Sequence, residues 1–212
     1  MNTTMNIGNW NAGARALVIG HGPAINAVAQ ALETSGARVT RLNHDSVSND
    51  IAAKTAFEQT ELAMGGGITI LVFGDRQSAA ASADLMTLQD WRAVTAINLD
   101  ARFFCAAELA RRAMAGQRKA VMLHLIGKQA EDAISGNAAA ASAAGGLLNL
   151  NMSLAVEWAR DNIRSNVIAT RLADQTGAGD DLALATLGAI AAYYCSDYAA
   201  YITGSCIGID ET

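Results

Sequence analysis

The sequence predicts an α/β fold: a single domain built on a doubly wound parallel sheet. Short runs of almost entirely apolar residues alternate along the chain with longer segments of helical spacing. Several of these apolar runs end at glycine, which suits a tight turn from a buried strand into a helix. Strands that are apolar on both faces are typical of a parallel sheet covered by helices on both sides.

The elements follow one another in a regular order. We expect strands at 14–20, 37–42, 68–73, 120–126, 164–169 and 205–209, and helices at 23–35, 49–64, 88–115, 135–160 and 182–196. The first helix has Pro23 in its first turn and Gly36 as its stop signal. Residues 1–13 are predicted to be a flexible N-terminal lead-in, and 14–212 a single domain.

The helix expected at 135–160 is the segment around which the functional argument turns. Its alanine-rich start favours a helix, and Leu147, Leu150, Leu154 and Trp158 form a buried stripe at helical spacing. The other face holds alanine, serine, glycine and asparagine. The sequence therefore offers no acid, base or nucleophile on that face.

Composition narrows the classes of function. Charged residues make up 17% of the chain, against a usual share of about 25%, so part of the surface is expected to be covered by another subunit. A net charge of −5 with scattered Lys and Arg predicts no nucleic-acid partner. No uninterrupted apolar run reaches a membrane span's length, which predicts no membrane partner. Cys105, Cys195 and Cys206 indicate buried thiols in the cytoplasm rather than a disulfide or metal site.

A glycine-containing turn follows the first strand. Gly20-His21-Gly22-Pro23 leads from the strand at 14–20 into the next helix. Glycines allow close backbone approach, and the unpaired N–H groups of a helix N-terminus attract a phosphate. This turn is a candidate dinucleotide site, although two glycines after a strand are more often only a turn.

Three segments resemble the short-chain dehydrogenase/reductase superfamily, in the order of that family. Residues 196–204 (SDYAAYITG), followed by an apolar strand and Asp210, resemble its C-terminal signature. Residues 91–99 (WRAVTAINL) resemble the segment around its asparagine, here Asn98, and 153–167 resembles the end of its catalytic helix. The resemblance implies a Rossmann-like fold over most of the chain.

The family's cofactor turn is only partly matched. Aligned to Thr-Gly-x-x-x-Gly-x-Gly, the chain keeps Gly20 but has Ala24 and Asn26 at the other two glycine positions, where side chains are expected to crowd the phosphates. Asn43 stands where an acidic residue would bind the ribose. His44 beside it could contact a 2′-phosphate, but it is expected to be a surface histidine. The candidate cofactor-binding residues are Gly20, His21, Gly22, Ile25, Asn43 and Gly74.

The family's catalytic set is also altered. Counting back from residues 153–155, the resemblance places Ala140 at the tyrosine, Ala144 at the lysine and Gly127 at the serine. Asn98 alone is retained, and a structural role for it is an alternative. His124 and Lys128 could supply a displaced acid or base. The preferred interpretations are a core or interface histidine with its hydrogen bonds satisfied and a solvated loop lysine.

Two regions are shorter than the family pattern. Residues 45–67 leave room for one helix where the family has a further strand as well, and 170–179 replace a long substrate lid. The sheet is therefore expected to be shortened, with little to enclose a substrate.

These observations lead to one hypothesis with two alternatives. The chain is expected to be a catalytically degenerate subunit without a cofactor or metal. It would stabilise an active paralogue, or pair with itself, through the helices at 88–115 and 135–160 and the C-terminal segment. The first alternative is an NAD(P)-dependent oxidoreductase with a rearranged active site. The second is a small-molecule sensor that uses the old cofactor cleft.

Overall fold

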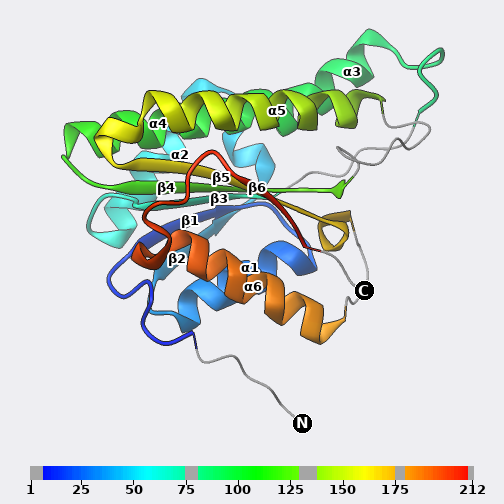
Figure 1. The fold of residues 1–212 in the computed structure, drawn as a ribbon. Helices are drawn as coiled ribbons and strands as arrows, with labels where there is room; N and C mark the ends of the chain where they lie inside the picture. Colours follow the sequence, from blue (N-terminus) through cyan, green and yellow to red (C-terminus); the bar gives the residue numbers. More distant parts are fainter. Residues whose placement is uncertain (1–6, 75–80, 129–137, 175–179, 210–212) are drawn as a thin grey trace.

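The structure, a computed structural model, describes residues 7–74, 81–128, 138–174 and 180–209. Its centre is a six-stranded sheet in the order β2-β1-β3-β4-β5-β6, and every neighbouring pair of strands is parallel. Helices cover both faces of the sheet (Figure 1). The predicted doubly wound α/β fold is confirmed.

All six predicted strands are present, with ends shifted by one or two residues. They are β1 (Arg15–Ile19), β2 (Arg38–Leu42), β3 (Ile70–Phe73), β4 (Ala120–Ile126), β5 (Ile163–Thr170) and β6 (Cys206–Ile209). Because the strands are parallel, their carboxyl ends share one edge of the sheet, called the carboxyl edge below. Their amino ends share the opposite edge, the amino edge.

Each face of the sheet carries its own helical layer. On one face, α1 (Pro23–Thr34) packs against α6 (Asp181–Cys195). On the other lie α2 (Asp50–Met64), α4 (Ala101–Ala115) and α5 (Ala138–Glu157), with α3 (Leu88–Thr95) projecting past the carboxyl edge (Figure 1). Between β2 and β3 the chain forms only a short 3-10 turn (His44–Val47) and α2, so the predicted shortening there is confirmed.

The helix predicted at 88–115 is interrupted. A single turn of π-helix (Ala96–Asp100) separates α3 from α4 and contains the buried Asn98. An extra residue in one turn changes which side chains face the sheet. Apolar spacing could not predict this interruption, because α3 buries none of its residues and adds no stripe to extend the pattern.

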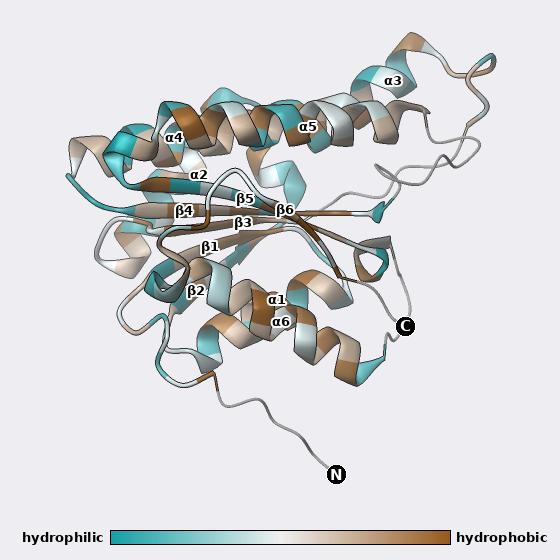
Figure 2. Cartoon of the chain, viewed as in Figure 1, coloured by the Kyte–Doolittle hydropathy of each residue, from teal (hydrophilic) through white to brown (hydrophobic). Residues whose placement is uncertain are grey.

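α5 departs from the expectation that no segment of the chain has the length and composition of a membrane span. By length and apolar composition alone its 20 residues could cross a membrane, although serine and asparagine interrupt every apolar run. In this fold, α5 packs on β5 and against the π-turn. Figure 2 shows that brown, hydrophobic residues also run through the central strands beneath it.

Part of the predicted N-terminal lead-in is fixed to the domain. Ile7 is buried, and the buried Asn11 donates from Nδ2 to Ser35 Oγ (2.9 Å) and to the carbonyl of Ala192 (3.0 Å). The asparagine side chain thus joins this loop to both α1 and α6, while the flexibility of the lead-in stays a prediction. Residues 1–6 lie outside the described residues.

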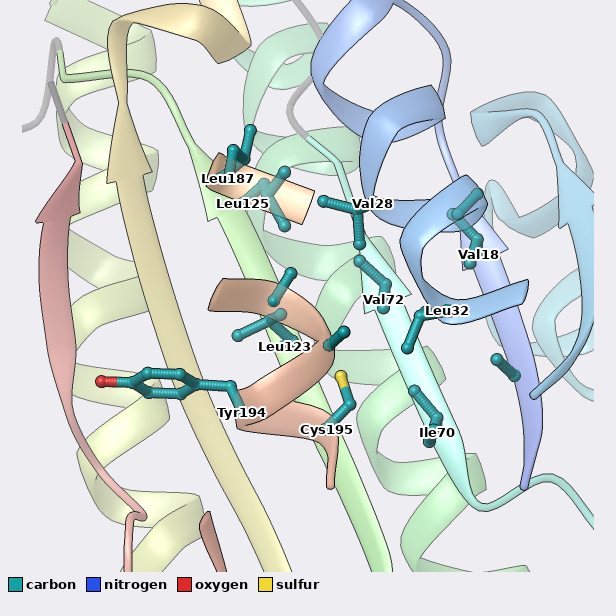
Figure 3. Close-up of a cluster of buried hydrophobic side chains, with 14 of the residues drawn as sticks. Val18, Val28, Leu32, Ile70, Val72, Leu123, Leu125, Leu187, Tyr194 and Cys195 are labelled. Atoms are coloured by element: carbon teal, nitrogen blue, oxygen red, sulfur yellow. The ribbon is translucent and has the colours of Figure 1, made fainter. Parts of the chain in front are cut away.

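The core divides along the sheet. Val18, Val28, Leu32, Val72 and Leu123 belong to the cluster between the sheet and the α1–α6 layer (Figure 3). Leu17, Phe57, Phe73, Leu109 and Met122 belong to the cluster on the opposite face. Neighbouring strand residues alternate between the two clusters, as a strand buried on both faces requires.

Candidate functional site

The carboxyl edge contains the point where the chain direction across the sheet reverses. From β1 the chain goes outward to β2 and then returns to β3 on the other side of β1. Doubly wound sheets bind ligands in the crevice outside the carboxyl ends of the strands at such a point. Gly20 follows β1 and Gly74 follows β3, so these two glycines mark the crevice.

Gly20 and Gly74 are glycines for a steric reason. Gly20 has φ +132°, and a β-carbon there would lie 3.3 Å from Gly74 Cα. A β-carbon on Gly74 would lie 3.2 Å from Cδ1 of the buried Ile25. The backbone is therefore closely packed here, with each glycine amide bonded to the sheet: Gly20 N donates to Leu42 O and Gly74 N to Ile19 O.

Gly22 leaves the start of α1 open. It has φ +105°, and a β-carbon on it would meet no atom within 4 Å. As the N-cap of α1, it provides no side-chain hydrogen bond to the helix. The first-turn N–H groups and the positive end of the helix dipole are thus free of a side-chain cap, which suits a phosphate.

Ala24 and Asn26, the two residues expected to crowd the phosphates, differ in burial: Ala24 is buried and Asn26 is exposed. Ala24 is buried in the apolar cluster beneath α1. Asn26 lines a groove between α1 and α6 together with Pro23 and Leu184. Neither residue comes within 4 Å of a β-carbon built on Gly22, so the space in front of that glycine is open. The crowding of a bound phosphate by these two side chains stays a prediction.

His44 is buried, so its prediction as a surface histidine is wrong. Its Nε2 lies 3.0 Å from the carbonyl of Gly74, and since a carbonyl only accepts, Nε2 carries the proton. The exposed His21 ring packs edge-on against it at 5.6 Å. His44 thereby links the end of β2 to the end of β3, while the preceding Asn43 is exposed at the crevice where a ribose would lie.

The positions aligned with the catalytic tyrosine, lysine and serine lie near the same edge. Ala140 and Ala144 are half-buried on successive turns of α5, and the buried Gly127 directly follows β4. Ala144 packs against a cluster that includes Ile126 and Leu147. These three residues offer no side-chain proton donor or acceptor.

Asn98 lies in the π-turn between α3 and α4, and it is buried. α5 packs against this turn, and a β-carbon on Gly146 would lie 3.2 Å from Cδ2 of the neighbouring Leu99. The retained asparagine thus occupies a special backbone position beside α5.

Arg102 is a buried residue near the site that sequence reasoning missed. Its guanidinium donates from Nη1 to Phe73 O (3.1 Å) and from Nη2 to Leu125 O (3.0 Å), and lies 4.9 Å from the Phe73 ring centroid. It therefore holds together the ends of β3 and β4, next to Gly74 and Gly127. Its place one helical turn after Asn98 was a signal that the sequence contained.

His124 projects from β4 toward the same layer as Arg102. It is fully buried, and neither ring nitrogen has a hydrogen bond with a described residue. Burial, with a smaller contribution from the positive charge of Arg102, lowers its pKa to about 3. The prediction of a core histidine is correct in its placement but not in its hydrogen bonding. A buried ring with so low a pKa is neutral at physiological pH and has little affinity for a proton, so it suits neither a general acid nor a general base.

Lys128 and the thiols complete the inventory of reactive groups. Lys128 is half-buried, and a β-carbon on Gly208 of β6 would lie 3.7 Å from its Nζ. Burial raises the pKa of the Cys105 and Cys195 thiols to about 12, whereas Cys206 is exposed, contrary to its prediction as a buried thiol. Among the described residues, no three His, Cys, Asp or Glu side chains gather as metal ligands.

Sequence comparison identifies relatives of the chain. A family model described as enoyl-(acyl carrier protein) reductase matches residues 10–181. A probable 2,4-dienoyl-CoA reductase from Bacillus subtilis is 31% identical over 185 residues, which span 77% of this chain and 72% of that protein.

Solved structures share the fold. A putative short-chain alcohol dehydrogenase from Sinorhizobium meliloti has a TM-score of 0.83 and 27% identity, covering 94% of this chain and 95% of its own. A short-chain type dehydrogenase/reductase from Mycobacterium marinum has a TM-score of 0.84 and 20% identity, covering 95% of each chain. The second likeness supports the fold alone.

The comparisons overturn one expectation. The altered glycine pattern predicts the absence of a cofactor, but the matched proteins are reductases and dehydrogenases of an NAD(P)-dependent family. The open Gly22 turn and the uncapped start of α1 fit that cofactor's pyrophosphate. The matched family model, the curated relative and the fold together place this chain in the short-chain dehydrogenase/reductase superfamily of oxidoreductases.

Proposed function

We propose that the chain is an NAD(P)H-dependent reductase of unsaturated acyl thioesters, with a rearranged active site. The observation that carries this proposal is the β1–α1 turn. Gly22 leaves open space in front of the uncapped N-terminus of α1, at the point where the sheet direction reverses. The pyrophosphate would lie there, and Asn43 would bind the adenosine ribose.

The substrate class follows from what the three positions aligned with the catalytic residues lack. Reduction of a ketone creates an alkoxide, which needs a proton donor at that oxygen, and Gly127, Ala140 and Ala144 provide none. When bound, the reduced nicotinamide supplies a hydride. If the hydride adds to the β-carbon of a conjugated thioester, the negative charge spreads onto the thioester oxygen, and water can protonate the α-carbon.

An enolate oxygen still needs electrostatic stabilisation. Lys128 is the described cation nearest in sequence to the end of β4, one residue beyond Gly127, and its side chain reaches toward β6. We assign Lys128 to this stabilisation. Asn98 and Arg102 would position the ends of β3 and β4 around the reacting atoms. The family model and the Bacillus relative, both named as reductases of unsaturated thioesters, support this substrate class.

The first experiment measures cofactor binding. NADH and NADPH are titrated into the purified chain by calorimetry, with Gly22→Ala as the test variant and Gly65→Ala as its control. Both glycines have positive φ, and a β-carbon on either would meet no atom within 4 Å, but Gly65 caps α2 near the amino edge. Gly22→Ala is expected to weaken binding by at least roughly tenfold, about 1.4 kcal/mol, whereas Gly65→Ala leaves it unchanged. Binding of neither nucleotide would refute the proposal.

The second experiment separates the two kinds of reduction. Oxidation of the preferred nucleotide is followed with crotonyl-CoA and sorboyl-CoA, which are conjugated, and with acetoacetyl-CoA, which offers a ketone. Turnover of the conjugated thioesters alone is expected, with a lower kcat in Lys128→Met and unchanged nucleotide affinity. Turnover of the ketone alone would refute the assigned substrate class.

A second candidate function is the stabilising subunit, and exposed apolar side chains favour it. Phe103 and Met114 on α4, and Met152 and Val156 on α5, are exposed in the monomer. They would be covered by an active paralogue or by another copy of this chain. Native mass spectrometry of the chain from its own host tests this candidate: a stoichiometric second chain with an intact Tyr-x-x-x-Lys helix is expected, and a lone monomer would exclude it.

A further inference from the structure

A second cavity lies at the amino edge, at the opposite end of the strands from the cofactor turn. Its volume is about 510 Å³, within the usual range for small-molecule sites. The N-terminal loop, the first residues of β3, β4 and β5, and the segment that follows α6 surround it. None of the cofactor candidates at the carboxyl edge contributes to its lining.

Arg164 gives this cavity a positive charge. Its guanidinium donates to the carbonyls of Tyr194 (2.8 Å), Ser196 (3.0 Å) and Ile202 (3.3 Å), using Nη1 and Nη2. Its Nε makes no hydrogen bond with a described residue and is not sealed from solvent. Carbonyl dipoles solvate the cation, but none of its described contacts is an ion pair with a carboxylate. Burial lowers the pKa of Arg164, and electrostatic attraction to Cys195 and Asp197 offsets only part of that effect. An anion in the cavity would add further compensation for the buried charge.

Lys119 and Asn162 add polar groups to the rim. Lys119 Nζ forms an ion pair with Asp197, but both side chains are mostly exposed, and such a pair is worth at most about 1 kcal/mol. Lys119 can therefore exchange Asp197 for a ligand at low cost. Asn162 is exposed, and its side-chain amide makes no hydrogen bond with a described residue.

The remaining wall is apolar and aromatic. Trp10 lines the cavity and is held by edge contacts with Tyr193 (6.2 Å) and Tyr198 (6.1 Å). Ile70 and Val121 contribute buried side chains, and Tyr201 stands fully exposed at the mouth. An indole ring fixed before binding costs little entropy when a flat ligand packs on it.

We infer that this amino-edge cavity binds a small organic anion that carries a flat apolar body. The anionic group is held by Arg164 and Lys119, and the apolar body packs between Trp10 and the starts of β3 and β4. Binding is independent of the cofactor, because the two sites lie at opposite ends of the parallel strands. The inference does not rest on the proposed reductase activity.

The probe is naphthylacetate, compared with its neutral amide, naphthylacetamide. Calorimetry on the full chain is expected to give saturable naphthylacetate binding that is at least roughly tenfold tighter than binding of the amide. Backbone NMR shifts are expected at Thr69, Lys119 and Thr203, which line the cavity. Saturation with NADPH should leave the affinity unchanged.

Two charge reversals test the assignment. Lys119→Glu is expected to weaken naphthylacetate binding at least roughly tenfold. The variant should fold normally, because the Lys119 side chain is mostly exposed. Lys54→Glu makes the same change of charge at an exposed position of α2 and should leave the affinity unchanged. Arg164→Lys should also weaken binding, because it keeps the charge but loses both the Nε donor and the guanidinium hydrogen bonds that orient the cation.

Three outcomes would overturn the inference: binding that fails to saturate, equal weakening by Lys119→Glu and Lys54→Glu, and NMR shifts that fall at Gly20 and Gly22. The second result indicates general attraction to a charged surface, and the third indicates occupation of the cofactor turn. Neither result bears on whether the chain reduces an unsaturated thioester.

Discussion

The two helical layers of this domain are stabilised by different interactions. Between the sheet and α1 and α6 the contacts are almost entirely apolar, with α6 lying close against α1 (Figure 3). On the opposite face lie all the buried histidine and charged side chains of the described residues: His44, Arg102, Glu108 and His124. The candidate active site lies at the carboxyl edge, where the start of α1 from the first layer and the start of α5 from the second layer meet the strand ends. Apolar packing thus fixes one layer, while the other accepts the cost of buried polar groups near the site.

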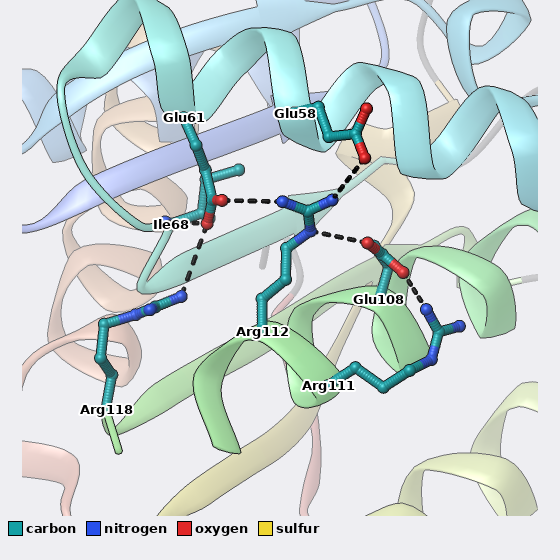
Figure 4. Close-up of polar contacts among 7 residues, drawn as sticks. All are labelled: Glu58, Glu61, Ile68, Glu108, Arg111, Arg112 and Arg118. Carbon is teal, nitrogen blue, oxygen red and sulfur yellow. Dashed lines mark hydrogen bonds and ion pairs between the residues drawn. The ribbon is translucent and has the colours of Figure 1, made fainter. Parts of the chain in front are cut away.

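The polar layer also contains a network of ion pairs between α2 and α4. Arg112 contacts Glu58, Glu61 and Glu108, while Arg111 also pairs with Glu108 (Figure 4). Glu61 further accepts a hydrogen bond from the backbone N–H of Ile68, just before β3. The network therefore joins α2, α4 and the residue before β3 through charged rather than apolar side chains.

The largest expected effect comes from removing the centre of this network. Arg112→Met leaves the buried Glu108 and the half-buried Glu61 without their shared cation. It should lower the free energy of unfolding by about 3 kcal/mol, the lower end of the cost of breaking a buried ion pair, because Arg111 still pairs with Glu108 and Arg118 with Glu61. Arg41→Met is the matched control, because it breaks an exposed pair with Glu33 of α1 and should cost less than about 1 kcal/mol. Urea unfolding measures both, and equal losses would contradict the difference between the layers.

A smaller effect, dependent on pH, is expected from His124. Its pKa is about 3 in the folded protein against an ordinary value of 6.5, so the unfolded chain binds more protons between these pH values. The stability is therefore complete above about pH 6.5 and falls as the pH decreases, by up to about 1.4 kcal/mol per pH unit.

The variant His124→Leu should remove this part of the pH dependence. Comparing urea unfolding of the variant and the parent at several pH values isolates the contribution of His124 from that of the carboxylates. His21→Leu changes an exposed histidine and should retain the parent slope. A parent slope that survives in His124→Leu would show that the buried ring is not the group responsible.

The same contrast explains what sequence reasoning could predict. The strands and the α1–α6 layer follow from apolar periodicity, since burial alone decides their structure. Gly20 and Gly74 were identifiable from their places after strands. The burial of His44 and Arg102 was not predictable, because each depends on a partner far along the chain: Gly74 O for His44 and Phe73 O for Arg102. For His124 the burial was predictable from its place in an apolar strand, but the lack of a hydrogen-bond partner among the described residues was not. A local pattern carries no information about such pairs.

The smallest expected effects come from two glycines, one in each layer. A β-carbon on Gly188 of α6 would lie 2.9 Å from the carbonyl oxygen of Ala27 in α1, so Gly188→Ala must separate the two helices and should cost about 1–3 kcal/mol. A β-carbon on Gly145 of α5 would meet no atom within 4 Å, so Gly145→Ala should stabilise the protein by about 0.5–1 kcal/mol through helix propensity. Thermal and urea unfolding should therefore shift in opposite directions. Destabilisation by both substitutions would mean that α5 is packed as closely as α6, and the contrast between the layers would then rest on charge alone.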